Sequence, residues 1–316
     1  MISVLMSIYS EPKNWIELSI NSISNQSYKN FEFIIINDNP KRQINIELLE
    51  KYKNIDPRIV VITNKSNLGL TKSLNKGLKI ATGDYIARMD ADDISLPDRF
   101  LKQVNFLDSN KEYIACGSSY TNINQIGGKK QIINSPETDA EIRSRIVLNN
   151  PIAHPTLMFR KDLVRLNNLY YDESLKYAQD YKFIFDLSQI GKLYNLQELL
   201  LNYRISEYQI SKNHSKDQIK FANTIREIIV IKTLKKININ TKVTTEIYDT
   251  NTSRFFEELN LLKIKNQDVI LNNIKLSLLI YSNRKFKLKH YLTMLISRKN
   301  TFKTRLRILK YFNNVC

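Results

Sequence analysis

The sequence predicts an α/β protein built on a mostly parallel sheet that is covered by helices on both faces. Within the first hundred residues, short apolar stretches of strand length alternate with stretches whose apolar residues recur at helical spacing. This alternation, at intervals that suit βαβ units, is typical of a parallel sheet. With 42% hydrophobic residues in a chain of 316, the protein can also bury a substantial core, which disfavours global disorder.

The expected elements follow one another in a regular order. Strands are predicted at residues 2–8, 31–36 and 59–62, with a fourth within residues 83–93, and helices around residues 15–23, 44–52 and 70–78. Polar residues come just after each strand: Tyr9 with Glu11, then Asp38, then Asn67, then Asp90 with Asp92. Ligands of such sheets sit beyond the carboxyl ends of the strands, so we expect these polar residues to converge on one crevice.

The fourth strand ends in three carboxylates within four residues, Asp90, Asp92 and Asp93. A buried strand that ends in such a cluster is unfavourable unless a cation neutralises it. Mg²⁺ and Mn²⁺ take oxygen ligands and often bridge carboxylates to substrate phosphates. The alternative is a solvated acidic turn in which Asp93 caps the next helix. The convergence of the other strand ends favours a metal site for a diphosphate-bearing substrate.

Glycine-rich phosphate loops are absent from the sequence. It contains no Walker-type motif and no G-x-G-x-x-G, which disfavours a P-loop NTPase or a dinucleotide enzyme. A phosphate would therefore be held by metal and side chains.

Several short motifs resemble, in order and at normal spacing, those of family-2 glycosyltransferases. They are Ser7-Ile8-Tyr9-Ser10-Glu11, Ile36-Asn37-Asp38, Asn67-Leu68-Gly69, Asn75-Lys76-Gly77, Gly83-Asp84-Tyr85-Ile86 and Asp90-Ala91-Asp92-Asp93. Further on, the stretch from Asn150 to Arg160, the stretch from Tyr177 to Tyr181, and Asn202-Tyr203-Arg204 with Gln209-Ile210-Ser211 continue the likeness. Gln179 replaces the usual Glu of the family, and Ser206 falls where a histidine is often seen.

The resemblance implies a GT-A fold and a division of the chain. Residues 1–214 would form the glycosyltransferase domain, with a nucleotide-sugar half at 1–110 and an acceptor half at 111–214. The resemblance ends there; charge and helical spacing predict that residues 215–316 form a basic helical region.

The resemblance also implies roles for single residues in an inverting reaction that needs Mn²⁺ or Mg²⁺. Asp92, with Asp90, would hold the metal, and Asp180 would act as general base. The nucleotide-sugar contacts would be Ser7, Tyr9, Glu11, Asp38, Asn67, Arg88, Asp90 and Ala91. Contacts to the acceptor or the diphosphate would be His154, Gln179 and Arg204.

Each of these roles has a structural alternative. Asp38 could form an Asx turn before Pro40. Arg88 could pair with Asp93 or Asp98.

The acceptor-side residues have structural alternatives as well. Asp180 could serve as a helix N-cap, where the helix dipole would lower its pKa and keep it ionised. His154 could be a structural histidine, and Arg204 an ordinary surface arginine.

The net charge of +17 belongs mainly to the C-terminal third. From Ser215 to the end there are 21 Lys and Arg against 7 Asp and Glu, and after Asp268 there are 11 basic residues and no acidic one. Apolar residues recur at helical spacing from Ile219 to Ile231 and again over 255–262, and residues 302–312 predict a basic amphipathic helix. We expect this region to bind an anionic membrane surface; the alternative is that its apolar faces pack on the catalytic domain.

The location is expected to be cytoplasmic, on the inner face of the membrane. The N-terminus enters strand-like sequence at once, which argues against a signal peptide, and no apolar run is long enough to span a bilayer. Two cysteines, Cys116 and Cys316, provide no disulfide framework.

The predicted function is transfer of a sugar from a nucleotide-sugar, with UDP the commonest nucleotide for this resemblance, to a hydroxyl of a growing, lipid-linked surface glycan. One alternative is a basic protein that binds nucleic acid or another anionic polymer beside an inactive α/β body. No nucleic-acid motif supports it, so no nucleic-acid partner is expected. The other alternative is a sugar nucleotidyltransferase, which the missing glycine-rich loop disfavours.

Overall fold

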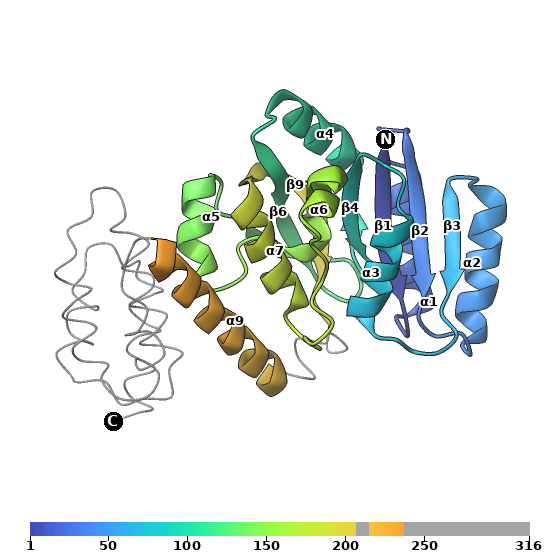
Figure 1. The fold of residues 1–316 in the computed structure, drawn as a ribbon. Coiled ribbons are helices and arrows are strands. Elements are labelled where there is room, and N and C mark those ends of the chain that lie inside the picture. The colour runs from blue at the N-terminus through green and yellow to red at the C-terminus, as the bar shows by residue number, and fades with distance from the viewer. Residues whose placement is uncertain (207–214, 237–316) are drawn as a thin grey trace. The chain divides into compact units, whose positions relative to one another are not determined.

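The computed structural model describes residues 1–206 and 215–236 (Figure 1). It divides the chain into two compact units, one formed by Met1–Ile142 with Asn150–Phe221 and the other by Arg143–Asn149 with Ala222–Cys316. The candidate site lies in the first unit.

The first four strands are parallel, as predicted. β1 (Ile2–Ile8) lies between β2 (Phe31–Asn37) and β4 (Tyr85–Asp90), and β3 (Ile59–Thr63) flanks β2. The connecting helices are α1 (Lys13–Ser24), α2 (Gln43–Ile55) and α3 (Leu70–Ile80). Each predicted strand and helix of this half is present, with boundaries that differ by a few residues.

Both faces of this half-sheet are covered by helices (Figure 1). On one face, Val4 and Met6 of β1 join the core with Ile16 and Ile20 of α1 and with residues of α2. On the other face lies α3, which approaches closely because Gly77 has no side chain. A Cβ there would lie 3.2 Å from the side chains of Leu5 and Ile36.

The second half of the first unit extends the sheet beyond β4. Its elements are β5 (Ile94–Ser95), α4 (Arg99–Ser109), β6 (Tyr113–Ile123), β7 (Lys129–Ile133), a 3₁₀ turn η1 (His154–Thr156), β8 (Met158–Arg160), α6 (Lys161–Leu166), α7 (Gln179–Ile190) and β9 (Lys192–Arg204). The helix α5 (Asp139–Ile146) begins in this unit and ends in the segment assigned to the second. The strand order is β3-β2-β1-β4-β8-β6-β9-β5, with β7 paired to β6. Because β8 runs antiparallel to β4 and β6, the sheet is mixed.

Two buried side chains of α4 join the halves of this sheet. Arg99 donates from Nη2 to the carbonyl oxygen of Arg88 (2.8 Å), and Gln103 donates from Nε2 to that of Thr156 (2.7 Å). The end of β4 and the η1 turn are thereby held against one helix.

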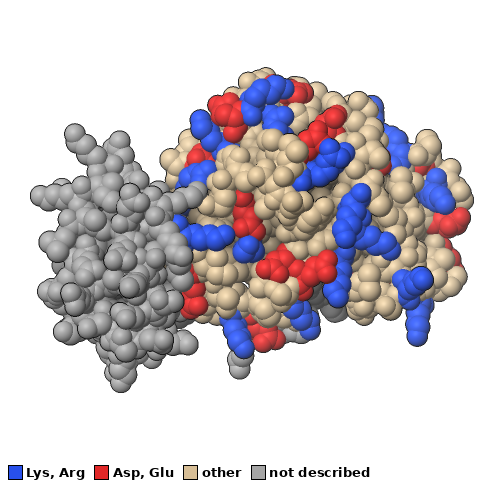
Figure 2. Space-filling model, viewed as in Figure 1, with Lys and Arg blue, Asp and Glu red and all other residues tan. Residues whose placement is uncertain are grey.

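On the face shown in Figure 2, the described residues carry mixed charge, with Lys and Arg interspersed among Asp and Glu. This distribution agrees with the nearly balanced charge of the first 214 residues, 27 basic against 24 acidic.

The helix α9 (Ser215–Lys236) coincides with the helical series that starts at Ile219. In the part of the chain that the structure describes, no helix is long and apolar enough to span a bilayer. The helices predicted over 255–262 and 302–312, on which the membrane prediction depends, lie outside the described residues.

Candidate active site

The carboxyl ends of β1 and β4 bring Glu11, Asp90 and Asp92 together, and we call these three residues the acidic cluster. β4 ends at Asp90, which pairs in register with Ser7 of β1. Burial, followed by the negative charges of Asp90 and Glu11, raises the pKa of Asp92 to about 7. Burial likewise raises the pKa of Glu11. At Asp92, burial and the repulsion between carboxylates therefore outweigh the opposing effect of the Arg204 guanidinium.

The loop after β1 positions Glu11. Its Oε2 accepts a hydrogen bond from the backbone N–H of Tyr9 (2.8 Å), and the Tyr9 carbonyl accepts one from Asn45 of α2. The Tyr9 ring is 43% exposed, so it is available to a ligand.

Asp38 holds the loop that follows β3. Its carboxylate accepts hydrogen bonds from Asn64 Nδ2 and from the backbone N–H groups of Leu68 and Gly69, each at 2.8 Å. The exposed Asn67 lies within this loop. The Asx-turn alternative is wrong for Asp38, because the side chain that accepts from Asn39 N–H is that of Asn37.

Arg88 is buried (1% exposed) and pairs with Asp90, while its Nη1 donates to the carbonyl oxygen of Leu5. The predicted alternative partners, Asp93 and Asp98, are wrong. Residues 88 and 90 point to the same face of β4, which makes Asp90 the nearest carboxylate.

Asp93 does not cap the following helix, so the acidic-turn alternative is wrong for this residue; Asp98 is at the N-cap of α4. It lies before the short strand β5, and its Oδ1 accepts a hydrogen bond from the backbone N–H of Arg204 (2.7 Å). The pairing of β5 with β9 draws Asp93 toward the end of β9, away from α4. Burial and the charges of Asp92 and Asp90 raise the pKa of Asp93 well above its usual value.

Arg204 is buried (1% exposed), so the surface-arginine alternative is wrong. Its Nε donates to the carbonyl oxygen of Asp92 (2.7 Å), its Nη1 donates to that of Gln125 (2.8 Å), and its guanidinium lies 4.9 Å from the centre of the Trp15 ring. Arg204 therefore fixes the backbone of the loop that carries Asp92.

Asp180 and Gln179 open α7, at the place predicted. Asp180 Oδ2 accepts a hydrogen bond from Asn150 Nδ2 (2.8 Å), and Gln179 is buried. The N-cap alternative is wrong, because Ala178 occupies that position in a left-handed conformation (φ 58°). The expected direction of the pKa shift is also wrong. Burial raises the pKa of Asp180 and outweighs the hydrogen bonds that lower it.

His154 is buried, and its Nε2 lies 2.8 Å from the hydroxyl of Tyr171. Burial, reinforced by the positive charge of Arg88, lowers the His154 pKa well below its usual value. The Tyr171 ring stacks on Phe183 at 4.2 Å, and Asn75 of α3 bonds both the backbone N–H and the carbonyl of Tyr171.

Tyr171 is a site residue that the sequence reasoning missed. It is near Asp180 and Asp90, whose charges act on its hydroxyl. Its neighbour Tyr170 is exposed, and nothing local distinguishes the two residues. The sequence offered one indication, Asn75 in the motif Asn75-Lys76-Gly77, but it did not reveal that Asn75 bonds Tyr171.

A divalent cation would fit the acidic cluster by charge. Among the described residues, no group of three His, Cys, Asp or Glu side chains forms a metal site by itself. Asp92, with Asp90, could hold a cation whose other positions are filled by water or by a ligand.

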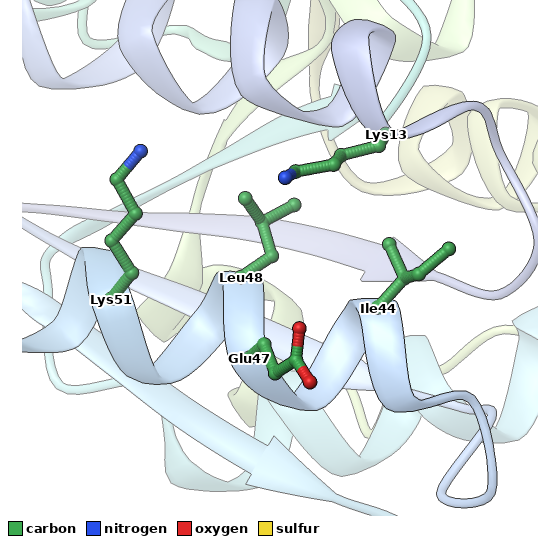
Figure 3. Close-up of a pocket in the computed structure, with 5 residues that line it drawn as sticks. All are labelled: Lys13, Ile44, Glu47, Leu48 and Lys51. Atoms are coloured by element: carbon green, nitrogen blue, oxygen red, sulfur yellow. The ribbon is translucent and has the colours of Figure 1, made fainter.

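A hollow lies between α1 and α2 (Figure 3), lined by Lys13, Ile44, Glu47, Leu48 and Lys51. None of the predicted site residues lines it, so it is separate from the acidic cluster.

Residues 3–166 match the sequence profile of the family described as Glycosyl transferase family 2. The chain is 35% identical over 255 residues to an uncharacterized glycosyltransferase of Haemophilus influenzae, with 78% of each chain covered. It is 31% identical over 223 residues to the amylovoran biosynthesis glycosyltransferase AmsE of Erwinia amylovora, covering 70% of this chain and 82% of that protein. S. aureus TarS 1-349 in complex with UDP-GlcNAc matches the fold with a TM-score of 0.62 at 17% identity, over 99% of this chain and 90% of that one.

Proposed function

The chain belongs to glycosyl transferase family 2 and has its GT-A type of fold, and from that premise we propose that it transfers a sugar from a UDP-sugar to a hydroxyl of a growing surface glycan. The observation that carries the proposal is the acidic cluster together with a further carboxylate, Asp180, whose pKa is raised by burial and by the charge of Asp90. Family membership disfavours the alternative of an inactive body that serves only to bind nucleic acid.

The donor and acceptor are inferred from the relatives. TarS, which shares the fold, has been solved with UDP and with UDP-GlcNAc, and AmsE is named for synthesis of a polysaccharide. These names support a nucleotide-sugar donor and a glycan acceptor. We further propose that the acceptor is lipid-linked and that the protein works at the inner face of the cytoplasmic membrane, which it reaches through residues 215–316.

The acidic cluster would hold Mn²⁺ or Mg²⁺ through Asp92 and Asp90. A bound cation would neutralise the charge that develops on the departing diphosphate. Glu11 and Tyr9 would contact the nucleoside from the loop after β1. Arg204 would keep Asp92 in place through the backbone of its loop.

Asp180 would remove the proton from the attacking hydroxyl, and the reaction would invert the anomeric carbon. Asn150 orients the carboxylate through the hydrogen bond to its Oδ2. A carboxylate whose pKa is raised by burial is a better proton acceptor than one in water, provided that it is ionised at the working pH.

A thermal-shift experiment tests this proposal. The full chain is melted with UDP, GDP or CMP, each with and without Mn²⁺. We expect UDP to stabilise the protein only with Mn²⁺; a ligand at 100 times its Kd adds about 2.7 kcal/mol. Asp92→Ala should abolish the response, while Asp98→Ala, an exposed carboxylate outside the cluster, should keep it.

Two outcomes would contradict the proposal. One is the absence of a response to every nucleotide. The other is an equal response with and without Mn²⁺, which would exclude the proposed metal requirement but not nucleotide binding.

A further inference from the structure

His154 and Tyr171 form a buried hydrogen bond whose direction follows from their surroundings. Tyr171 is 3% exposed and His154 is 8% exposed, and the Tyr171 hydroxyl is 2.8 Å from His154 Nε2. Either group could be the donor, so the direction of the bond has to be argued from the surroundings.

The hydroxyl of Tyr171 must donate. Burial raises the pKa of Tyr171, so the hydroxyl keeps its proton. Within the described part of the chain, its one hydrogen-bonding neighbour is His154 Nε2. A buried hydroxyl proton without an acceptor is costly, and donation to Nε2 removes that cost. Nε2 is therefore the unprotonated nitrogen of the ring.

The proton of His154 must then be on Nδ1. Burial and the adjacent Arg88 guanidinium disfavour the doubly protonated imidazolium, since they lower the pKa of His154. A neutral imidazole carries one proton, and Nε2 is occupied as an acceptor. No described residue accepts a hydrogen bond from Nδ1, so an uncharged N–H donor remains.

This donor is held rigidly. The Tyr171 ring stacks on Phe183, and Asn75 bonds the Tyr171 backbone at 2.9 Å through N–H and 2.8 Å through the carbonyl. Thr71, one turn earlier on α3, donates to the carbonyl oxygen of Leu175 (3.2 Å). The helix α3 thus fixes the segment that supports His154.

Two carboxylates are near enough for their charges to act on the pair. In addition to burial, the negative charges of Asp180, on α7, and of Asp90, the β4 partner of Arg88, raise the pKa of Tyr171. A sugar hydroxyl donates one hydrogen bond and accepts others, so it is matched by an uncharged N–H beside a carboxylate. In the proposed function Asp90 holds the cation at the diphosphate of the donor, so we assign the hydroxyl to the donor sugar.

We propose that His154 binds a hydroxyl of the donor sugar through Nδ1–H, and that Tyr171 is the positioning residue that fixes this tautomer. The identity of the ligand depends on the proposed function, whereas the tautomer does not. With Nε2 bonded and Nδ1 protonated, His154 is no proton acceptor, and proton removal falls to Asp180.

Nitrogen-15 NMR of the histidine rings tests the tautomer in the free protein. The chain contains three histidines, and the His154 signals are those that disappear in His154→Asn. We expect a protonated-type shift at Nδ1 and an unprotonated-type shift at Nε2. In Tyr171→Phe the signals should move toward a mixture of tautomers. A His154 ring protonated at Nε2, or one unaffected by Tyr171→Phe, would overturn the assignment.

Two substitutions test the binding role. The amide nitrogen of Asn can occupy the place of Nδ1, while that of Gln occupies the place of Nε2. The Kd is measured for UDP and for whichever of UDP-glucose, UDP-galactose and UDP-GlcNAc stabilises the wild type most. We expect His154→Gln to weaken UDP-sugar binding about tenfold and His154→Asn by less than about threefold, with UDP unchanged in both.

The outcomes separate the two proposals. If Asn and Gln weaken binding equally, or if UDP binding falls along with that of the UDP-sugar, the role of Nδ1–H is wrong. If the wild type binds no UDP-sugar, the proposed function and the sugar contact both fail, while the nitrogen spectra still decide the tautomer.

Discussion

Buried polar groups repel one another in the acidic cluster but form a hydrogen bond in the His154–Tyr171 pair. In the cluster, carboxylates crowd one another, and the pKa of Asp92 rises to about 7 from burial and the charges of Asp90 and Glu11. In the pair, the buried hydroxyl meets a ring nitrogen at 2.8 Å. In the cluster, Arg88 and Arg204 offset the repulsion between the carboxylates only in part, whereas in the pair the two facing groups satisfy each other. Removing a polar group should therefore have opposite effects on stability in the two places.

The largest expected effect is on activity. Asp180→Asn keeps the shape of the side chain but removes the proposed base, so UDP release from the donor in the presence of membrane glycan should fall by about 10²–10⁴-fold. UDP binding and Tm should stay near the wild type. Asp162→Asn, an exposed carboxylate on α6, is the control. Retention of more than about a tenth of the activity would exclude Asp180 as the base.

The pH dependence sharpens the same assignment. The folded pKa of Asp180 is raised, so the ionised base is lost as pH falls through that raised value. We expect turnover to decline on the acid side at a pH above the usual range of Asp. A turnover that is flat down to pH 4 would contradict this expectation.

The next effect is on stability. Arg204→Lys loses the planar fork that bonds the carbonyls of Asp92 and Gln125, and we expect a loss of about 3 kcal/mol in the free energy of unfolding. Urea unfolding measures it. Arg165→Lys, whose side chain is 74% exposed, should be neutral. Equal effects of the two substitutions would show that Arg204 does not fix the loop.

Tyr171→Phe tests the hydrogen bond of the His154–Tyr171 pair. The stacking on Phe183 remains, but Nε2 of His154 loses its donor, and the protein should be destabilised by about 1–2 kcal/mol. Urea unfolding beside Tyr170→Phe, at an exposed neighbour, provides the comparison. No difference between the two variants would mean that the buried bond adds nothing.

Asp92→Asn tests the acidic cluster. It should have the smallest effect on the free energy of unfolding and should raise it, whereas Tyr171→Phe lowers it. The folded pKa of Asp92, about 7, lies above the ordinary value of an Asp, so ionisation progressively destabilises the fold as the pH rises from that ordinary value to about 7. In the presence of a chelator, the substitution should raise the free energy of unfolding by ~1 kcal/mol or less at pH 8, a small amount because solvent screens the repulsion. The gain should be smaller at pH 5, where less of Asp92 is ionised. A loss of stability at pH 8 would show that Asp92 is not under repulsion.

The sequence by itself determined the first half of the fold and the composition of its strand ends. Strand and helix periodicities are local, and parallel strands necessarily deliver their carboxyl ends to one edge. That is why β1 to β4 were predicted correctly, and why Glu11 and Asp92 could be expected to meet. The family resemblance rested on the same local motifs, and the match to residues 3–166 confirms it.

Tertiary structure alone decided how these groups are paired and how strongly water is excluded from them. Asp93 was expected to cap a neighbouring helix, but its partner Arg204 lies 111 residues away, brought there by the pairing of β5 with β9. The pKa of Asp180 was expected to fall at a helix N-terminus, yet burial raises it. The position of Tyr171 depends on a hydrogen bond to Asn75, 96 residues away, and its pKa depends on burial. Long-range contacts and desolvation leave no local trace in the sequence, so these features could only be seen in the folded chain.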